Sequence, residues 1–163
     1  MTALVGSPPG RARSAEAGGV LLDTATDAPH AVAVSVVRAE KLNLHRDPRG
    51  WVFEPVGPDD LPRQRNVHAV LTLPGAVRGN HYHERGTEFL IVVGPALVRL
   101  REGEQTRDQT IPDGEAWRFV IPPGVPHAIR NTGEAPIFMF GFNSVAHDPA
   151  APDTKPCLLI PPP

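Results

Sequence analysis

Hydrophobic and polar positions alternate over short stretches of the chain with a period of two, and no stretch keeps a helical period. Turn residues separate these stretches, and the chain has 20 prolines and 15 glycines to form them. Short strands joined by many turns predict an all-β fold, either a barrel or a sandwich. We read residues 102–108 as a polar hairpin region and expect strands at residues 31–38, 51–56, 66–73, 89–93, 96–101, 117–121 and 136–143.

The stretch from Phe89 to Val93 is entirely apolar, which is typical of a strand buried on both faces. If Glu88 points inward, strand parity turns Phe89, Ile91 and Val93 outward. Three large apolar side chains on one outer face would form a patch that is unusual for a monomer. We therefore expect a second sheet layer or another subunit to cover them, most simply in a homodimer.

The first 30 residues are rich in Ala, Gly, Pro, Ser and Arg and show no periodicity. We interpret residues 1–30 as a disordered leader, with an arm that packs on a partner subunit as the alternative. Residues 31–163 are then long enough for one domain with a sizeable core.

Charge and composition argue against several classes of function. The formal net charge is −2 and no basic stripe is present, so we do not expect a nucleic-acid partner. No apolar run approaches the length of about 20 residues that a membrane-spanning helix needs, and no secretion signal is apparent. The single cysteine, Cys157, fits a reducing compartment and predicts a cytoplasmic location.

Two segments carry residues with metal-ligand chemistry. His81 and His83 are two positions apart, so on a strand their imidazoles leave the same face. Glu88 follows a short turn that contains Gly86, and an antiparallel return would bring its carboxylate back toward the two rings. His127 comes directly after a proline- and glycine-rich turn, at the expected start of another strand.

Three neutral imidazoles and one carboxylate cluster poorly without a cation, because each buried polar group needs a partner. One divalent metal bound by His81, His83, Glu88 and His127 would satisfy all four and leave one or two positions open. Imidazole and carboxylate ligands suit Zn, Fe, Mn, Ni or Cu. A cluster of proton-transfer groups is the alternative interpretation.

Other polar residues are candidates for contact with a small-molecule substrate. His68 lies on the strand before the two histidines and could be a general base or acid, although a structural role fits it equally well. Arg78, Arg99 and Arg101 could bind a phosphate or carboxylate through two parallel hydrogen bonds. Their alternative role is a solvated strand face.

The spacing of these residues resembles the two motifs of the cupin superfamily. The first motif has its closing glycine one residue early, and the glycine before the second motif lies two residues further upstream than usual. The resemblance implies a double-stranded β-helix, which is a small jelly-roll barrel, in a single domain with the site near its mouth. The matching residues are Gly75, His81, His83, Glu88 and Gly94 in the first motif and Gly114, Pro122, Gly124, His127 and Asn131 in the second.

A closer resemblance covers most of residues 45–155, including segments 47–50, 78–83, 121–133 and 148–154. These segments are similar to the C-terminal cupin domain of capsular-polysaccharide sugar-nucleotide reductases, a zinc-binding epimerase module that acts on a keto-sugar nucleotide. The resemblance implies zinc as the favoured metal. It also implies an epimerase or isomerase that acts next to a keto group in polysaccharide or deoxysugar biosynthesis.

Residues 78–82 also resemble, more loosely, the segment that carries the catalytic histidine of deoxysugar 3,5-epimerases and 3,4-ketoisomerases. Those enzymes generally need no metal, whereas this chain has His83, Glu88 and His127 as well. His81 cannot be both ligand and base, so we assign it as a ligand and take His68 as the first candidate for the base. An iron-dependent dioxygenase or other oxidoreductase and a non-enzymatic ligand-binding cupin are the competing functions.

Overall fold

The computed structural model describes residues 36–163. The predicted leader at residues 1–30 and most of the expected strand at residues 31–38 lie outside the described residues. The described chain consists of strands and one short 3-10 helix, Leu61–Arg63. The strands are β1 (Arg38–Lys41), β2 (His45–Asp47), β3 (Gly50–Val52), β4 (Asn66–Thr72), β5 (Val77–His83), β6 (Glu88–Val93), β7 (Ala96–Glu102), β8 (Gln105–Ile111), β9 (Ala116–Ile121), β10 (His127–Asn131), β11 (Ile137–Asn143) and β12 (Thr154–Pro156).

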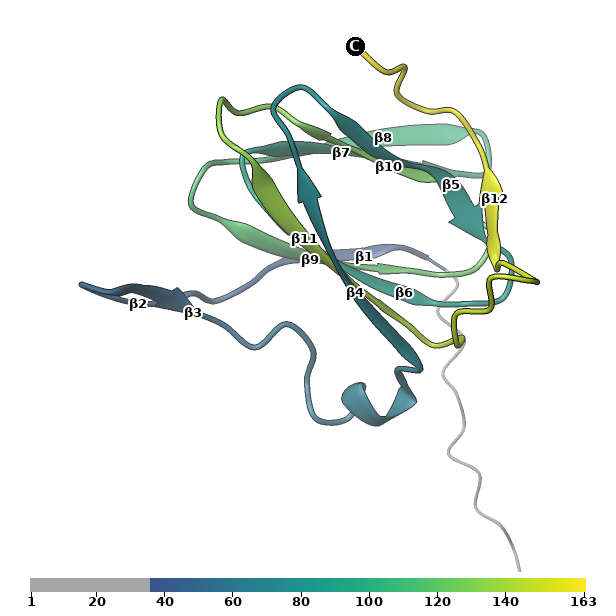
Figure 1. The fold of residues 1–163 in the computed structure, drawn as a ribbon, viewed down its shortest axis with the longest axis horizontal. Helices are drawn as coiled ribbons and strands as arrows, with labels where there is room; N and C mark the ends of the chain where they lie inside the picture. Colours follow the sequence, from purple (N-terminus) through teal and green to yellow (C-terminus); the bar gives the residue numbers. More distant parts are fainter. Residues whose placement is uncertain (1–35) are drawn as a thin grey trace, which may run out of the picture. The chain divides into compact units, whose positions relative to one another are not determined.

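Two five-stranded antiparallel sheets form the barrel, and Figure 1 shows them facing each other. The β6 sheet has the order β1-β9-β6-β11-β4, and the β5 sheet has the order β12-β5-β10-β7-β8. A separate two-stranded hairpin, β2–β3, stands off from both sheets. Consecutive strands often lie in opposite sheets, as in a jelly roll. This arrangement confirms the all-β prediction.

The main core fills the space between the two sheets. On β7, Ala96, Val98 and Leu100 point into it and are buried, while the residues between them are partly exposed. Phe119 on β9 and Met139 on β11 contribute from the opposite sheet. The alternation that predicted the strands therefore sorts side chains between the core and the outer faces.

A second apolar cluster covers the outer face of the β6 sheet. Phe89 and Ile91 point outward, as expected, and both are buried. Phe53 and Val56 pack over them, because β3 ends at Val52 and the expected strand 51–56 is replaced by a segment that folds onto the sheet. The same chain thus supplies the cover for Phe89 and Ile91 for which a sheet layer or a second subunit was expected, whereas Val93 is partly exposed.

The expected polar hairpin region at residues 102–108 contains the turn of the β7–β8 hairpin, and the second strand of that hairpin, β8, continues to Ile111. Gly103, with φ of +60°, lies in the tight turn between β7 and β8, where a left-handed conformation favours glycine. β8 is an edge strand of the β5 sheet and most of its residues are exposed. It therefore lacks the hydrophobic alternation by which the other strands were predicted. No helix among residues 36–163 is long and apolar enough to cross a membrane.

Candidate metal centre

The structure brings together the four residues predicted as metal ligands. His81 and His83 lie at the end of β5, His127 begins β10, and Glu88 begins β6. One potential ligand atom from each residue lies within 4.8 Å of the others. His83, Glu88 and His127 are buried and His81 is partly exposed. The group therefore has three imidazoles and one carboxylate converging on a single point.

The route by which Glu88 reaches the histidines differs from the expected one. β5 and β6 do not pair as an antiparallel hairpin, because β5 lies in one sheet and β6 in the facing sheet. β5 pairs with β10 and β12, and β6 pairs with β9 and β11. The turn at residues 84–87 crosses between the sheets. The three imidazoles thus come from one sheet, and the carboxylate faces them from the other.

A local irregularity in β5 sets the position of His81. Gly79 and Asn80 have φ of +78° and +56°, both in the left-handed region, and the pairing with β10 shifts register between His127 and Ala128. A Cβ at Gly79 would lie 2.8 Å from the His127 carbonyl oxygen, so a side chain cannot fit there. The close approach brings the His81 and His127 rings to 4.7 Å between centroids.

His127 is oriented by its own backbone. Its Nδ1 lies 3.1 Å from the carbonyl oxygen of Val125, so Nδ1–H can donate to that acceptor. This tautomer leaves Nε2 without a hydrogen, and Nε2 lies 3.1 Å from Glu88 Oε2. Metal-binding histidines commonly have their second nitrogen fixed by such an acceptor.

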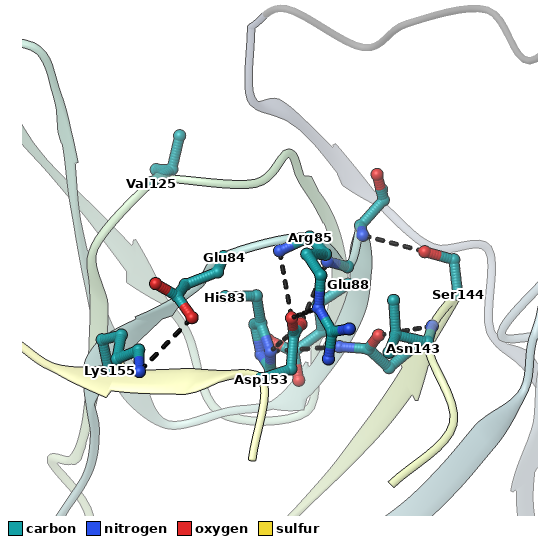
Figure 2. A network of polar contacts seen from close by, with 12 residues as sticks. His83, Glu84, Arg85, Glu88, Val125, Asn143, Ser144, Asp153 and Lys155 are labelled. Carbon is teal, nitrogen blue, oxygen red and sulfur yellow. Dashed lines mark hydrogen bonds and ion pairs between the residues drawn. The ribbon is translucent and has the colours of Figure 1, made fainter. Parts of the chain in front are cut away.

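His83 also points its Nε2 toward Glu88, but its Nδ1 has different partners from the Nδ1 of His127. Its Nε2 lies 3.4 Å from Glu88 Oε2, which places it on the side of the other ligands. Its Nδ1 lies 3.2 Å from Asn143 Nδ2 and 3.4 Å from Asp153 Oδ2. Figure 2 shows His83 among Glu88, Asn143 and Asp153. Two imidazoles thus present Nε2 to the same carboxylate oxygen.

The electrostatics favour the protonation states that a metal needs at His81 and Glu88. At His83, by contrast, burial alone would lower the pKa, but Glu88 and Asp153 outweigh it and raise the pKa. Burial, reinforced by the neighbouring His127, lowers the pKa of His81 to about 4, so this imidazole is neutral at pH 7. Burial alone would raise the pKa of Glu88, but the adjoining imidazoles of His127 and His83 outweigh it and lower the pKa below its usual value. A neutral imidazole and an ionised carboxylate are the ligand forms of these side chains.

Two buried atoms of the group lack a hydrogen-bond partner among the described residues, namely His83 Nε2 and Glu88 Oε2. Leaving such atoms unsatisfied costs about 1–3 kcal/mol each. A divalent cation at the point of convergence would satisfy both at once. The residues therefore fit a metal ion of the type predicted from the sequence.

A cavity of about 380 Å³ is lined by three of the four clustered residues. This volume is within the range of pockets that take small ligands. His68, Arg78 and His81 contribute polar groups to its wall, together with Glu88 and His127. The apolar part of the wall is formed by Val70, Val77, Leu90, Ile129 and Met139.

Gly141 allows His68 to lie beside the cluster. His68 on β4 pairs with Gly141 on β11. A Cβ at Gly141 would overlap the His68 ring and lie 2.8 Å from Glu88 Oε1. The bare backbone at this position therefore leaves room for the imidazole of His68 next to the carboxylate of Glu88.

The three candidate arginines are placed differently. Arg78 lines the cavity, and its guanidinium lies 3.4 Å from the Leu71 carbonyl oxygen on β4. Arg99 and Arg101 alternate with core residues of β7, so they point to the outer face of the barrel. Arg99 binds Asp108 through two hydrogen bonds of 2.7 Å. Of the three, only Arg78 is near the cluster.

Sequence reasoning missed three residues around the site: Asn143, Asp153 and Gly141. Asp153 lies 70 positions from His83 in the sequence, and no spacing rule links the two. Asn143 and Gly141 lie on a strand whose aromatic residues dominate its pattern. Their parity places Gly141 on the inner face, and this is the one signal that could have indicated it.

The family model of the polysaccharide biosynthesis C-terminal domain matches residues 45–155. The matched range contains β2 through β11 and all four clustered residues. The chain belongs to this family. It is 30% identical over 129 residues to the spore coat polysaccharide biosynthesis protein SpsL of Bacillus subtilis. This match covers 73% of the chain and 85% of SpsL.

A second relative is the UDP-2-acetamido-2,6-beta-L-arabino-hexul-4-ose reductase of Pseudomonas aeruginosa, which is 32% identical over 117 residues. The match covers 70% of the chain but 31% of the reductase. Among solved structures, the capsular polysaccharide assembling protein CapF of Staphylococcus aureus matches with a TM-score of 0.54 and 24% identity, over 72% of the chain and 33% of CapF. The chain thus spans about a third of each of these two proteins.

The sugar 3,4-ketoisomerase QdtA of Thermoanaerobacterium thermosaccharolyticum, solved in complex with TDP, matches with a TM-score of 0.58 and 20% identity. This match covers 73% of the chain and 86% of QdtA. The likeness concerns the fold, and it confirms the predicted cupin barrel.

We predict that the purified protein binds one divalent metal ion and that His83→Ala and His127→Ala each lose most of it, because each variant removes one of four converging ligands. Elemental analysis after dialysis gives the stoichiometry, and removal of the metal by a chelator is expected to lower the melting temperature. His45→Ala on the exposed strand β2 is the matched control. Equal metal content in all four proteins would contradict the prediction.

Proposed function

We propose that the protein is an epimerase or isomerase of a nucleotide-linked keto-sugar, with a 4-keto-6-deoxy sugar nucleotide as the first candidate. The observation that carries the proposal is a single small cavity whose wall contains three residues of the four-residue cluster, a separate histidine and an arginine. Membership of a polysaccharide biosynthesis family supports the same substrate class. QdtA, whose barrel is similar, was solved with TDP bound.

The proposed cofactor is one zinc ion held by His81, His83, Glu88 and His127. When bound, zinc would supply Lewis acidity that polarises the substrate carbonyl and makes the adjacent C–H bond more acidic. The remaining chemistry falls to the protein side chains that surround the substrate.

His68 is proposed as the proton-transfer group. Its ring lines the cavity beside Glu88 and is not one of the clustered ligands, so its imidazole is available to a substrate. His68 would take the proton from the carbon next to the ketone, and the carbonyl oxygen would gain the negative charge. Return of a proton to the other face of that carbon gives epimerisation. Isomerisation results when the former carbonyl oxygen and carbon each gain a proton and the hydroxyl on the deprotonated carbon loses its proton to become the new carbonyl.

Arg78 is proposed to bind the nucleotide diphosphate at the entrance of the cavity. It is exposed and reaches from β5 toward β4, across the space between the two sheets. The apolar wall near Leu90 and Met139 suits the less polar part of a deoxysugar. Arg99 and Arg101 have no part in this proposal, because they lie on the outer face.

The function is tested by solvent exchange. Nucleotide-linked keto-sugars are incubated with zinc-loaded protein in deuterated water, and the proton next to the ketone is followed by NMR. We expect exchange above the buffer rate, and we expect His68→Ala to slow it by about two orders of magnitude or more, because a general base contributes that much. His147→Ala, an exposed histidine outside the cavity, should leave the rate unchanged.

A wild-type rate equal to the buffer rate with every keto-sugar tested would contradict the proposal. Iron in the purified protein together with oxygen uptake would favour the dioxygenase instead. Binding of a sugar nucleotide without exchange would favour a ligand-binding protein. The cytoplasmic location stays a prediction from the single cysteine.

We also propose that the active form is a homodimer. The outer face of the β6 sheet carries exposed apolar side chains at its β4 edge, where Leu71 is 46% exposed and its cross-strand neighbour Phe138 is 53% exposed. Val67 on β4 and Leu73, which directly follows β4, extend this patch, and among the described residues β4 has no partner strand on its other side. An exposed apolar edge strand is unfavourable for a monomer, and a second copy would cover it.

We expect Leu71→Lys to dissociate this dimer, because it places a charge in the middle of the apolar patch. Analytical ultracentrifugation at micromolar concentration measures the mass of both proteins. Leu158→Lys, which changes another exposed leucine that lies outside β4 and β11, is the control and should stay dimeric. A wild-type protein that sediments only as a monomer would contradict the dimer.

A further inference from the structure

The segment of residues 153–161, called the strap below, runs along the outer edge of the strand that carries two of the clustered histidines. Its strand β12 pairs with β5, with Thr154 opposite His83 and Pro156 opposite His81. The carbonyl of Asp153 accepts a hydrogen bond of 2.9 Å from the Glu84 amide. The strap is thus an additional strand of the β5 sheet next to the cluster.

Asn80 fixes the strap at its far end. This residue has φ of +56°, which asparagine tolerates better than most side chains. Its Oδ1 accepts hydrogen bonds from the amides of Leu159 and Ile160 at 2.8 and 3.0 Å, and its Nδ2 donates to the Ile160 carbonyl at 2.8 Å. Ile160 itself is 2% exposed. The residue that binds the strap directly precedes His81.

Arginines of the β5 sheet also hold the strap. Arg99 donates to the Leu159 carbonyl at 3.4 Å, and Arg130 donates to the Pro161 carbonyl at 3.1 Å. Arg101 contacts Cys157 Sγ at 2.9 Å. These contacts give Arg99 and Arg101 a role on the outer face of the sheet, away from the cavity.

The first residue of the strap, Asp153, reaches the cluster. Its Oδ1 accepts hydrogen bonds from the Arg85 amide at 3.0 Å and the Arg85 Nε at 3.1 Å, and its Oδ2 accepts from the Gly86 amide at 3.0 Å. A Cβ at Gly86 would lie 2.8 Å from Oδ2, so the turn can approach this closely only with glycine. The carboxylate is therefore fixed, with Oδ2 at 3.4 Å from His83 Nδ1 (Figure 2).

His83 Nδ1 faces two groups of opposite hydrogen-bonding character. Asn143 presents Nδ2, since its Oδ1 accepts a hydrogen bond from the Val145 amide, and Nδ2 can only donate. Asp153 presents an ionised oxygen, which can only accept. Asn143 thus favours the tautomer with hydrogen on Nε2, whereas Asp153 favours the tautomer with hydrogen on Nδ1. Only the second tautomer leaves Nε2 free to bind a metal.

We propose that Asp153 is a positioning residue for the metal centre, and that its carboxylate holds His83 as the Nδ1–H tautomer so that Nε2 is available to the metal. The inference rests on the metal site of the proposed function, but not on its substrate. Carboxylates that orient a metal-binding histidine typically change metal affinity about 10–100-fold when they are removed.

The test is Asp153→Asn, which keeps the size of the side chain and an acceptor oxygen but removes the charge. Zn²⁺ affinity is measured by competition with a chromophoric chelator. The His83 tautomer is read from ¹⁵N NMR of histidine-labelled, zinc-loaded protein. We expect the variant to bind Zn²⁺ about 10–100-fold more weakly and to lose the Nδ1–H signal or shift it.

Two controls separate positioning from a general loss of structure. Asp148→Asn changes an exposed carboxylate that binds the Ala150 amide, and Lys155→Ala removes the ion pair of the strap with Glu84, at 3.4 Å. Both should keep the wild-type affinity and the wild-type His83 signals. The melting temperature of each metal-free protein shows whether the barrel remains folded.

An Asp153→Asn affinity within twofold of wild type would overturn the proposal. So would a lower affinity with the His83 signals unchanged, or a wild-type protein that binds no Zn²⁺. Failure of the proposed function alone gives a different result. The wild type would then bind Zn²⁺, and Asp153→Asn would bind it more weakly, but no keto-sugar would exchange its proton with solvent.

Discussion

The site depends on one buried contact, between the carboxylate of Glu88 on one sheet and the imidazoles of His83 and His127 on the other. Glu88 is 3% exposed, and an ionised group at that depth is costly unless it is paired. The two imidazoles are the partners within reach. A divalent cation between the sheets would compensate the carboxylate more fully than neutral rings can.

Much of the surrounding structure keeps the two sides of this contact at a fixed distance. Glycines at positions 79 and 141 let backbones and rings approach where a Cβ would collide. The Val125 carbonyl orients His127 from the turn that precedes β10. Phe53 and Val56 cover the outer face of β6, the strand that carries Glu88. The geometry of the cluster is thus a property of the whole barrel.

The cluster of three histidines and one glutamate could be predicted from the sequence because its information is local. A spacing of two on a strand fixes a shared face for His81 and His83, and turn residues place Glu88 and His127 at strand starts. The pairing of strands is not local, so the crossing of the chain from β5 to β6 between the two sheets was predicted wrongly as a hairpin. The edge strand β8 was missed because exposure on both faces removes its hydrophobic alternation. Asp153 could not be found, since only the pairing of β12 with β5 brings it to His83.

The central claim is that three imidazoles and one carboxylate hold a single metal ion, and X-ray absorption at the zinc edge of zinc-loaded protein tests it most directly. The account predicts only nitrogen and oxygen neighbours, at about 2.0–2.2 Å, with outer-shell scattering from three imidazole rings. A sulfur neighbour at about 2.3 Å would mean that zinc binds Cys157, the single cysteine of the chain. That result, or scattering from fewer than two imidazoles, would contradict the account.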